Sequence, residues 1–255
     1  MKKIYYIVSL ALVSGMTLSG CGKSEDVSVE DLLTETQEVM KGVEGVEVAT
    51  TLELETNDSS DGKSIVKGRS QEERVQGSMK MYREVEMTVD DEPPYSEEQY
   101  IVDDGSMYSG ADNEWIFFSE TTYQIEDILF DRSSVYVNIE QVLSRMAAAA
   151  EASSSHVDYK EDDGVHVLTL GSMHEKLKNP ETLFQVPVDI SVYDLEAVIN
   201  KETAIIERLT ITCELSYEES GEVIDEKLIL DSKISVAEDV DVKVPQEVLD
   251  AARSY

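Results

Sequence analysis

The sequence predicts an α+β protein in which one large, curved, antiparallel β-sheet, shaped like a half-barrel, is wrapped around helices. Three observations lead to this fold class. Long segments alternate between apolar and polar residues, turn-forming residues separate them, and few segments have helical spacing. A sheet with one apolar face must bury that face, so the helices are expected on its concave side.

The first twenty residues have the parts of a secretory signal peptide. Lys2 and Lys3 supply positive charge, and the run from Ile4 to Leu18 contains no charged residue and is short for a membrane span. The run ends in Leu18-Ser19-Gly20-Cys21, which resembles the bacterial lipobox. The resemblance implies cleavage between Gly20 and Cys21 and a diacyl lipid on the Cys21 sulfur. The alternatives are an uncleaved apolar anchor or an ordinary signal peptide followed by a chance cysteine.

These features divide the chain into a signal peptide (residues 1–20), a lipidated tether (21–30) and one domain (31–255). The expected location is the extracytoplasmic face of the cell membrane, with the membrane bound through the N-terminal lipid. Loss of Lys2 and Lys3 changes the net charge from −33 to −35, which repels nucleic acid and anionic lipid headgroups. Lipidation of Cys21 leaves Cys213 without an intrachain disulfide partner.

The first half of the domain begins with a helix and continues as strands joined by hairpins. Leu32, Leu33, Thr36, Val39 and Met40 have helical spacing, and Gly42 or Gly45 is suited to end the helix. Alternation then predicts strands at 46–56, 64–74, 77–89, 99–102, 107–108 and 115–118. The connecting segments are rich in Asp, Asn, Gly and Pro, as antiparallel hairpins require.

The second half has a helical middle and long closing strands. An amphipathic piece is expected at 125–130, a helix at 139–152 and an ambiguous segment at 173–183. Strands are expected at 156–159 and 166–170. Three more strands follow, with apolar faces at 186–199, 209–217 and 228–234. In the first of these the alternation of apolar and polar residues shifts by one position, which predicts a β-bulge near Tyr193-Asp194.

The order of these elements resembles that of the LolA/LppX-like lipoproteins, in particular an uncharacterised Gram-positive family with that fold. The likeness rests on the lipobox, the helix at Asp31–Met40, the paired strands of 99–108 before Glu114-Trp115, the turn at 200–203 and the exit at Pro245. An aspartate is more usual where Asn200 stands. The resemblance implies a half-barrel whose concave side holds an acyl chain, because LolA-like proteins carry lipoproteins and LppX-like proteins bind lipids.

Chemical signatures are weak elsewhere, so no metal site, cofactor or catalytic residue is expected. The three histidines, His156, His166 and His174, form no ligand motif, although 156 and 166 would be close on paired strands. Ser153-Ser154-Ser155 beside His156 is adjacency along the chain only. The acidic clusters Asp90-Asp91-Glu92, Glu161-Asp162-Asp163 and Glu218-Glu219 lie at hairpin tips and lack a calcium-loop pattern. Cys213 alternates in phase with apolar neighbours and reads as a buried, inert thiol.

Two functions follow from this sequence. The first is a non-enzymatic, membrane-anchored lipoprotein that binds a hydrophobic ligand, such as a lipid or acyl chain, in a half-barrel cavity. The second is a structural or protein-interaction lipoprotein of the cell envelope, for example in sporulation, whose sheet interior is a filled core. Neither function involves nucleic acid, and the protein partner is unspecified.

The lipid anchor is directly testable. Substitution of Cys21 by alanine removes the sulfur that carries the diacylglycerol, so the variant is expected to take up no palmitate analogue in growing cells. A Cys213→Ala variant serves as the matched control and should label as the wild type does. Labelling of the Cys21→Ala chain would contradict the assignment.

Overall fold

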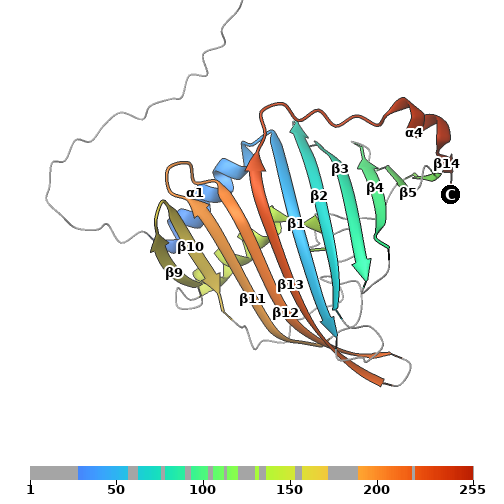
Figure 1. Ribbon diagram of the computed structural model, residues 1–255. Coiled ribbons are helices and arrows are strands. Elements are labelled where there is room, and N and C mark those ends of the chain that lie inside the picture. Colours follow the sequence, from blue (N-terminus) through green and yellow to red (C-terminus); the bar gives the residue numbers. More distant parts are fainter. Residues whose placement is uncertain are drawn as a thin grey trace, which may run out of the picture.

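A computed structural model describes residues 28–56, 63–75, 78–89, 93–102, 106–111, 114–119, 130–131, 136–152, 157–171, 189–219 and 222–254. Its main feature is a single 12-stranded sheet, strongly curved and open, with helices behind it in the view of Figure 1. The strand order is β14-β6-β5-β4-β3-β2-β1-β13-β12-β11-β10-β9. The predicted large antiparallel sheet with helices on one side is therefore confirmed in outline.

Two hairpin series meet in the centre of the sheet. The first series runs outward from β1 and comprises β1 (Gly45–Thr56), β2 (Lys63–Val75), β3 (Ser78–Val89), β4 (Tyr95–Ile101), β5 (Met107–Ala111) and β6 (Glu114–Phe118). The second comprises β9 (Val157–Asp162), β10 (Val165–Leu170), β11 (Asp189–Asn200), β12 (Ile206–Glu219) and β13 (Glu222–Val236). Antiparallel pairing of β1 with β13 joins them, so the first and last long strands lie side by side.

Two helices cover the inner face, which is the face of the sheet turned toward them. Helix α1 (Val29–Lys41) begins at Ser28, whose Oγ accepts a hydrogen bond from the Asp31 backbone N–H at 3.4 Å. Helix α2 (Ile139–Ala152) begins at Asn138, whose Oδ1 accepts from the Gln141 backbone N–H at 3.1 Å. The helices pack against each other, with Gln37 Nε2 3.5 Å from Ser144 Oγ.

The core lies between these helices and the inner face of β1–β3 and β9–β13. Leu33 and Met40 of α1 and Leu143 and Met146 of α2 are at most 1% exposed. They share one apolar cluster with inner-face residues of the sheet, among them Leu52, Leu168, Leu195, Ile211 and Leu230. Side chains therefore fill this half of the half-barrel, and the filled-core alternative holds for it.

The chain ends with a segment that crosses to the far edge of the sheet. After β13 it leads to helix α4 (Gln246–Ala251) and strand β14 (Arg253–Ser254), which pairs parallel to β6 (Figure 1). Gly45 marks the start of this crossing, because a Cβ there would lie 2.3 Å from the Ala237 carbonyl oxygen. The Val242 backbone N–H donates to Glu73 Oε2 at 3.0 Å, which fixes the segment against β2.

Several sequence predictions need correction. Helix α1 begins at Val29, so the last residues of the expected tether belong to the helix. Strand β4 starts four residues early, at Tyr95 directly after the two prolines. The register shifts of β11 fall between Ile190 and Val192 and between Val198 and Ile199, not at Tyr193-Asp194. The small β7–β8 hairpin (Phe130–Asp131 with Tyr136–Val137), α4 and β14 were not expected.

Other predictions lie outside the described residues: the signal peptide and lipobox, the 173–183 segment, and most of the 125–130 piece. Among the helices that the structure describes, none has the length and apolar character needed to cross a membrane.

The core predicts the cost of truncating its side chains. A Leu143→Ala substitution in α2 is expected to lower the free energy of unfolding by about 2–5 kcal/mol, because it opens a cavity in a filled interior. Leu249→Ala in α4 is the control, since Leu249 is 42% exposed and its truncation should change stability by about 0.5 kcal/mol or less. Urea denaturation measures both, and equal losses would contradict the packing described.

Candidate functional site

One row of inner-face side chains crosses the sheet from β1 to β5. The register places Val46 opposite Glu72, Glu72 opposite Met81, Met81 opposite Ile101, and Ile101 opposite Met107. Val46 belongs to the core beneath the helices, whereas Met81 and Ile101 form a second apolar cluster. A carboxylate therefore stands between two apolar areas of the same face.

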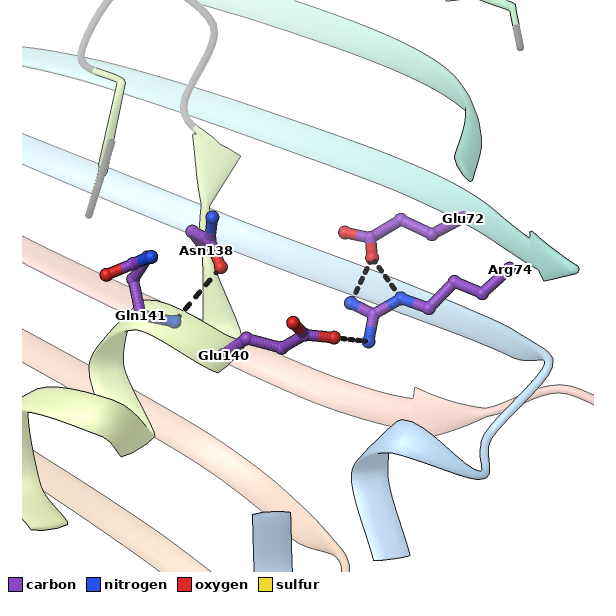
Figure 2. Close-up of polar contacts among 5 residues, drawn as sticks. All are labelled: Glu72, Arg74, Asn138, Glu140 and Gln141. Atoms are coloured by element: carbon purple, nitrogen blue, oxygen red, sulfur yellow. Dashed lines mark hydrogen bonds and ion pairs between the residues drawn. The ribbon is translucent and has the colours of Figure 1, made fainter. Parts of the chain in front are cut away.

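Glu72 is held by its neighbour on β2. Its Oε2 accepts hydrogen bonds from Arg74 Nη2 at 2.6 Å and from Arg74 Nε at 3.1 Å. Arg74 Nη1 lies 3.4 Å from Glu140 Oε1, in the first turn of α2 (Figure 2). One guanidinium thus links the inner face of β2 to the start of the covering helix.

The burial of Glu72 determines its electrostatics. The side chain is 0% exposed, and the loss of solvation raises the pKa of its carboxyl group above the usual value. The positive charges of Arg74 and Arg83 oppose this shift, and Glu140 adds to it. Glu72 Oε1 accepts no hydrogen bond from the residues that the structure describes. The carboxyl group is therefore poised to take up a proton more readily than a surface glutamate.

A second polar row runs parallel to the first. Arg83 of β3 is 3% exposed and lies opposite Ser70 on one side and Gln99 on the other. Gln99 Nε2 donates to Glu97 Oε1 at 2.8 Å, and the Ser109 hydroxyl donates to the same oxygen. The inner face of β2–β5 therefore contains a polar band that is buried at Ser70, Glu72 and Arg83 and half-buried on β4 and β5.

The second apolar cluster borders this band. We call it the methionine patch, and it consists of Met79, Met81, Ile101 and Met107. Met81 and Ile101 are at most 5% exposed, whereas Met79 and Met107 are half-buried. Methionine side chains are flexible and polarisable, and they adapt to apolar partners of differing shape. Ile116, on the same face of β6, is 40% exposed.

The predicted histidine arrangement is only partly described. His166 lies on β10, and its Nδ1 is 3.0 Å from the Tyr159 hydroxyl. Its cross-strand partner is Glu161. Burial and the charge of Lys201 lower the pKa of His166. His156, His174 and Ser153–Ser155 lie outside the described residues.

The acidic clusters behave as ordinary hairpin residues where the structure describes them. Glu161 Oε1 accepts from Lys201 Nζ at 2.6 Å, and Asp162 Oδ2 accepts from Lys160 Nζ at 3.1 Å. Within the described ranges no group of three His, Cys, Asp or Glu residues is placed to hold a metal ion. Asp90-Asp91-Glu92 and the side chains of Glu218 and Glu219 lie outside the description.

The two cysteines differ in status. Cys213 is 0% exposed on the inner face of β12, and burial raises the pKa of its thiol to about 12, which confirms an inert core thiol. Gly20 and Cys21, the predicted cleavage and lipidation residues, precede the described part of the chain, and their roles stay predictions.

Glu72, Arg74 and Arg83 were not singled out from the sequence. Charged residues are so frequent in this chain that Gln71-Glu72-Glu73-Arg74 reads as an ordinary solvated strand. One signal was present in the sequence. The alternate residues of β2 that face inward change from apolar Val66 to Gly68, Ser70, Glu72 and Arg74, whereas the inward residues of neighbouring β1 stay largely apolar.

Comparison with known families identifies the chain. A family of unknown function, DUF6612, matches residues 28–253. The chain belongs to this family. The match begins at the residue that caps α1 and ends in β14, so the DUF6612 unit coincides with the folded domain. No curated protein matches.

Solved structures show only distant likeness. A DUF1329 family protein from Desulfovibrio piger shares 10% identity over 83% of this chain and 93% of its own, with a TM-score of 0.33. A β-barrel-like DUF1849 protein from Brucella abortus shares 9% identity over 77% of this chain and 99% of its own, with a TM-score of 0.28. A chain of the MucA/MucB complex of Pseudomonas aeruginosa shares 12% identity over 86% of this chain and 61% of its own, with a TM-score of 0.27. Such scores assign no function, and the LolA/LppX resemblance stays a prediction.

The buried pair predicts a pH-dependent coupling. At pH 8, Arg74→Met is expected to cost about 3–5 kcal/mol of unfolding free energy, because it leaves a buried carboxylate without its partner. The cost should shrink in a Glu72→Gln background, where no charge remains to be compensated. Urea denaturation of the two single variants and the double variant gives the coupling energy.

The sign of the pH effect follows from the raised pKa of Glu72. The folded state binds the proton more tightly than the unfolded chain, so stability from this group is fully present below about pH 4.5 and is lost as the pH rises through the folded-state pKa. Wild-type stability should therefore fall relative to Glu72→Gln as the pH rises above about 4.5. A constant difference would contradict a buried, shifted carboxyl group.

Proposed function

We propose that the protein is a lipid-anchored, extracytoplasmic binding protein without enzymatic activity, and that the methionine patch receives the apolar part of a lipid or another hydrophobic ligand. The observation that carries this proposal is the separation of two apolar areas on one inner face. Helices α1 and α2 close the first area, whereas the second is a distinct cluster with half-buried methionines at its margin.

The chemistry of the patch suits such a ligand. Binding sites for apolar molecules are mostly hydrophobic and contain a few fixed polar groups that orient the ligand. Here Met79, Met81 and Met107 supply adaptable apolar contact. The buried band of Glu72 and Arg83 runs along one side of the patch and supplies fixed polar groups.

The alternative, a protein-interaction role through an edge strand, has less support. Strand β9 is one edge of the sheet, and it carries Lys160, Glu161 and Asp162 with exposed side chains. Charges on an edge strand oppose the addition of another strand. The interaction role therefore stays second to ligand binding.

The proposal is tested with the chain from Gly22 onward. The purified protein is extracted with organic solvent, and the extract is examined by mass spectrometry for bound lipid. Titration with a fluorescent fatty-acid analogue measures the affinity of the protein for an acyl chain. Met79→Gln and Met107→Gln are each expected to weaken the analogue's binding several-fold. Full burial of a methionine side chain contributes about 1.5–3 kcal/mol, and because both side chains are already half-buried, the ligand gains only part of it.

Val223→Gln is the matched control, since it introduces the same amide at a 65% exposed apolar residue of β13, which β1 and β2 separate from the patch strands β3–β5. Its affinity should equal that of the wild type. A lipid-free extract together with no measurable analogue binding would refute the proposal, and so would equal weakening by all three substitutions.

A further inference from the structure

The outer face of the sheet, opposite the helices, contains a hollow of about 410 Å³. It lies over the middle of β1, β2, β3 and β13, which are adjacent in the centre of Figure 1. Its lining residues are Ala49, Thr50, Thr51, Lys67, Gly68, Arg69, Glu84, Glu86, Asp231 and Lys233. This site is on the other side of the sheet from the methionine patch.

The register explains why a hollow forms here. Along one row, Lys233 of β13 lies opposite Ala49 of β1, Ala49 opposite Arg69 of β2, and Arg69 opposite Glu84 of β3. In the next row Asp231 lies opposite Thr51, and Thr51 opposite Lys67. The small side chains of β1 therefore form a low floor between the long side chains of β13 and β2.

Three cations surround this floor with no ion-pair partner in the part of the chain that the structure describes. Lys67, Arg69 and Lys233 are exposed, and none makes a salt bridge. The acid nearest to them on β13, Asp231, is occupied by Arg208, whose Nε and Nη2 donate to its two oxygens at 2.6 and 3.0 Å. In a chain of net charge −33, this is a local gathering of basic side chains, and Glu84 and Glu86 face Arg69 and Lys67 across the strands.

Two carboxylates line the hollow on β3, beyond the cations of β2. Glu84 and Glu86 of β3 are exposed and line the hollow, and neither makes an ion pair in the described structure although each faces a cation across the strands. Beside Glu84 in the register lies Glu98. Tyr82 and Tyr100 follow in the next outer-face row, with ring centroids 4.9 Å apart. Carboxylates beside aromatic rings are a favourable environment for an ammonium group.

We propose that this hollow binds a zwitterion, with a phosphate on Lys67, Arg69 and Lys233 and an ammonium group on Glu84 and Glu86. Neighbouring strands are about 5 Å apart, so the carboxylates of β3 begin about one strand spacing from Lys67 and Arg69 of β2, while Lys233 of β13 lies on the other side of β1. A phosphate and an ammonium group joined by two carbons, as in phosphoethanolamine, match this separation. The source is either the headgroup of a phospholipid or a free phosphoethanolamine solute.

The test uses the full-length protein in maltoside micelles and equilibrium dialysis with labelled O-phosphoethanolamine. We expect saturable, salt-sensitive binding of one molecule per chain. Arg69→Gln and Lys233→Gln should each weaken binding about tenfold, because each removes a charge-assisted contact to the phosphate. Glu84→Gln should weaken it by a similar factor, and should leave the binding of inorganic phosphate unreduced.

Two surface substitutions with the same charge changes serve as controls: Lys160→Gln in β9 and Glu238→Gln after β13. Both residues are exposed and lie outside the hollow, so neither should alter binding by more than about twofold. Absence of binding overturns the proposal. Binding that Arg69→Gln leaves unchanged, or inorganic phosphate that binds as tightly as phosphoethanolamine, overturns it as well.

A second arm distinguishes the sources. The protein is reconstituted in phosphatidylglycerol vesicles with or without phosphatidylethanolamine, and binding of the soluble probe is measured in both. Loss of probe binding in the mixed vesicles assigns the hollow to the lipid headgroup, whereas equal binding assigns it to the free solute. Either result supports a zwitterion site, and neither depends on the methionine patch.

Discussion

Burial of the inner face is the constraint on which this structure depends. Alternation along the long strands directs one apolar row after another to the same side, and an uncovered sheet of that extent would expose a large hydrophobic surface. Helices α1 and α2 meet this requirement for β1 and β9–β13, where Leu33 and Leu143 are 0% exposed. The sheet can stay open because helices, and not a second sheet, supply the opposing layer.

The same alternation distributes the charge of the chain. A protein with 54 acidic residues folds only if nearly all of them reach water, and the outer-face phase of each strand provides that position. Glu72 and Glu226 are buried exceptions among the described residues, at 0% and 5% exposure, and Glu72 is bound to Arg74. A buried ion pair is seldom a net source of stability, but its geometry fixes how groups meet. Here it fixes the start of α2 over β2 and separates the core from the methionine patch.

The sequence predicted those parts of the fold in which local pattern and tertiary packing agree. Helix α2 was expected at 139–152 and is found at Ile139–Ala152, because helix-forming residues also supply its buried stripe. The β-bulge of β11 was expected but misplaced by two residues, since the phase slip is visible in the sequence while the pairing that locates it depends on β12.

Other elements had no local signal to find. Strand β14 contains two residues and exists only because the C-terminal segment reaches β6, a contact set by tertiary structure. Arg74 donates hydrogen bonds to both Glu72 and Glu140, and these two acids are more than sixty positions apart in the sequence. No spacing rule connects them. Similarly, the outer hollow depends on the order of the strands in the sheet. Lys233 and Arg69 flank Ala49 only because β13 and β2 both pair with β1.

The start of helix α1 and the methionine patch belong to different halves of the sheet. Helix α1 has 13 residues and is therefore about 20 Å long, and its C-terminal end leads directly into β1. The negative charge of Glu35 in α1 acts on His166 of β10, so α1 extends toward the β9–β10 side of the sheet. The methionine patch lies on β3–β5, across β1 from that side. The helices that close the core and the half-buried methionines are thus kept on separate halves of one face, which lets the same sheet hold both a filled interior and a second apolar area.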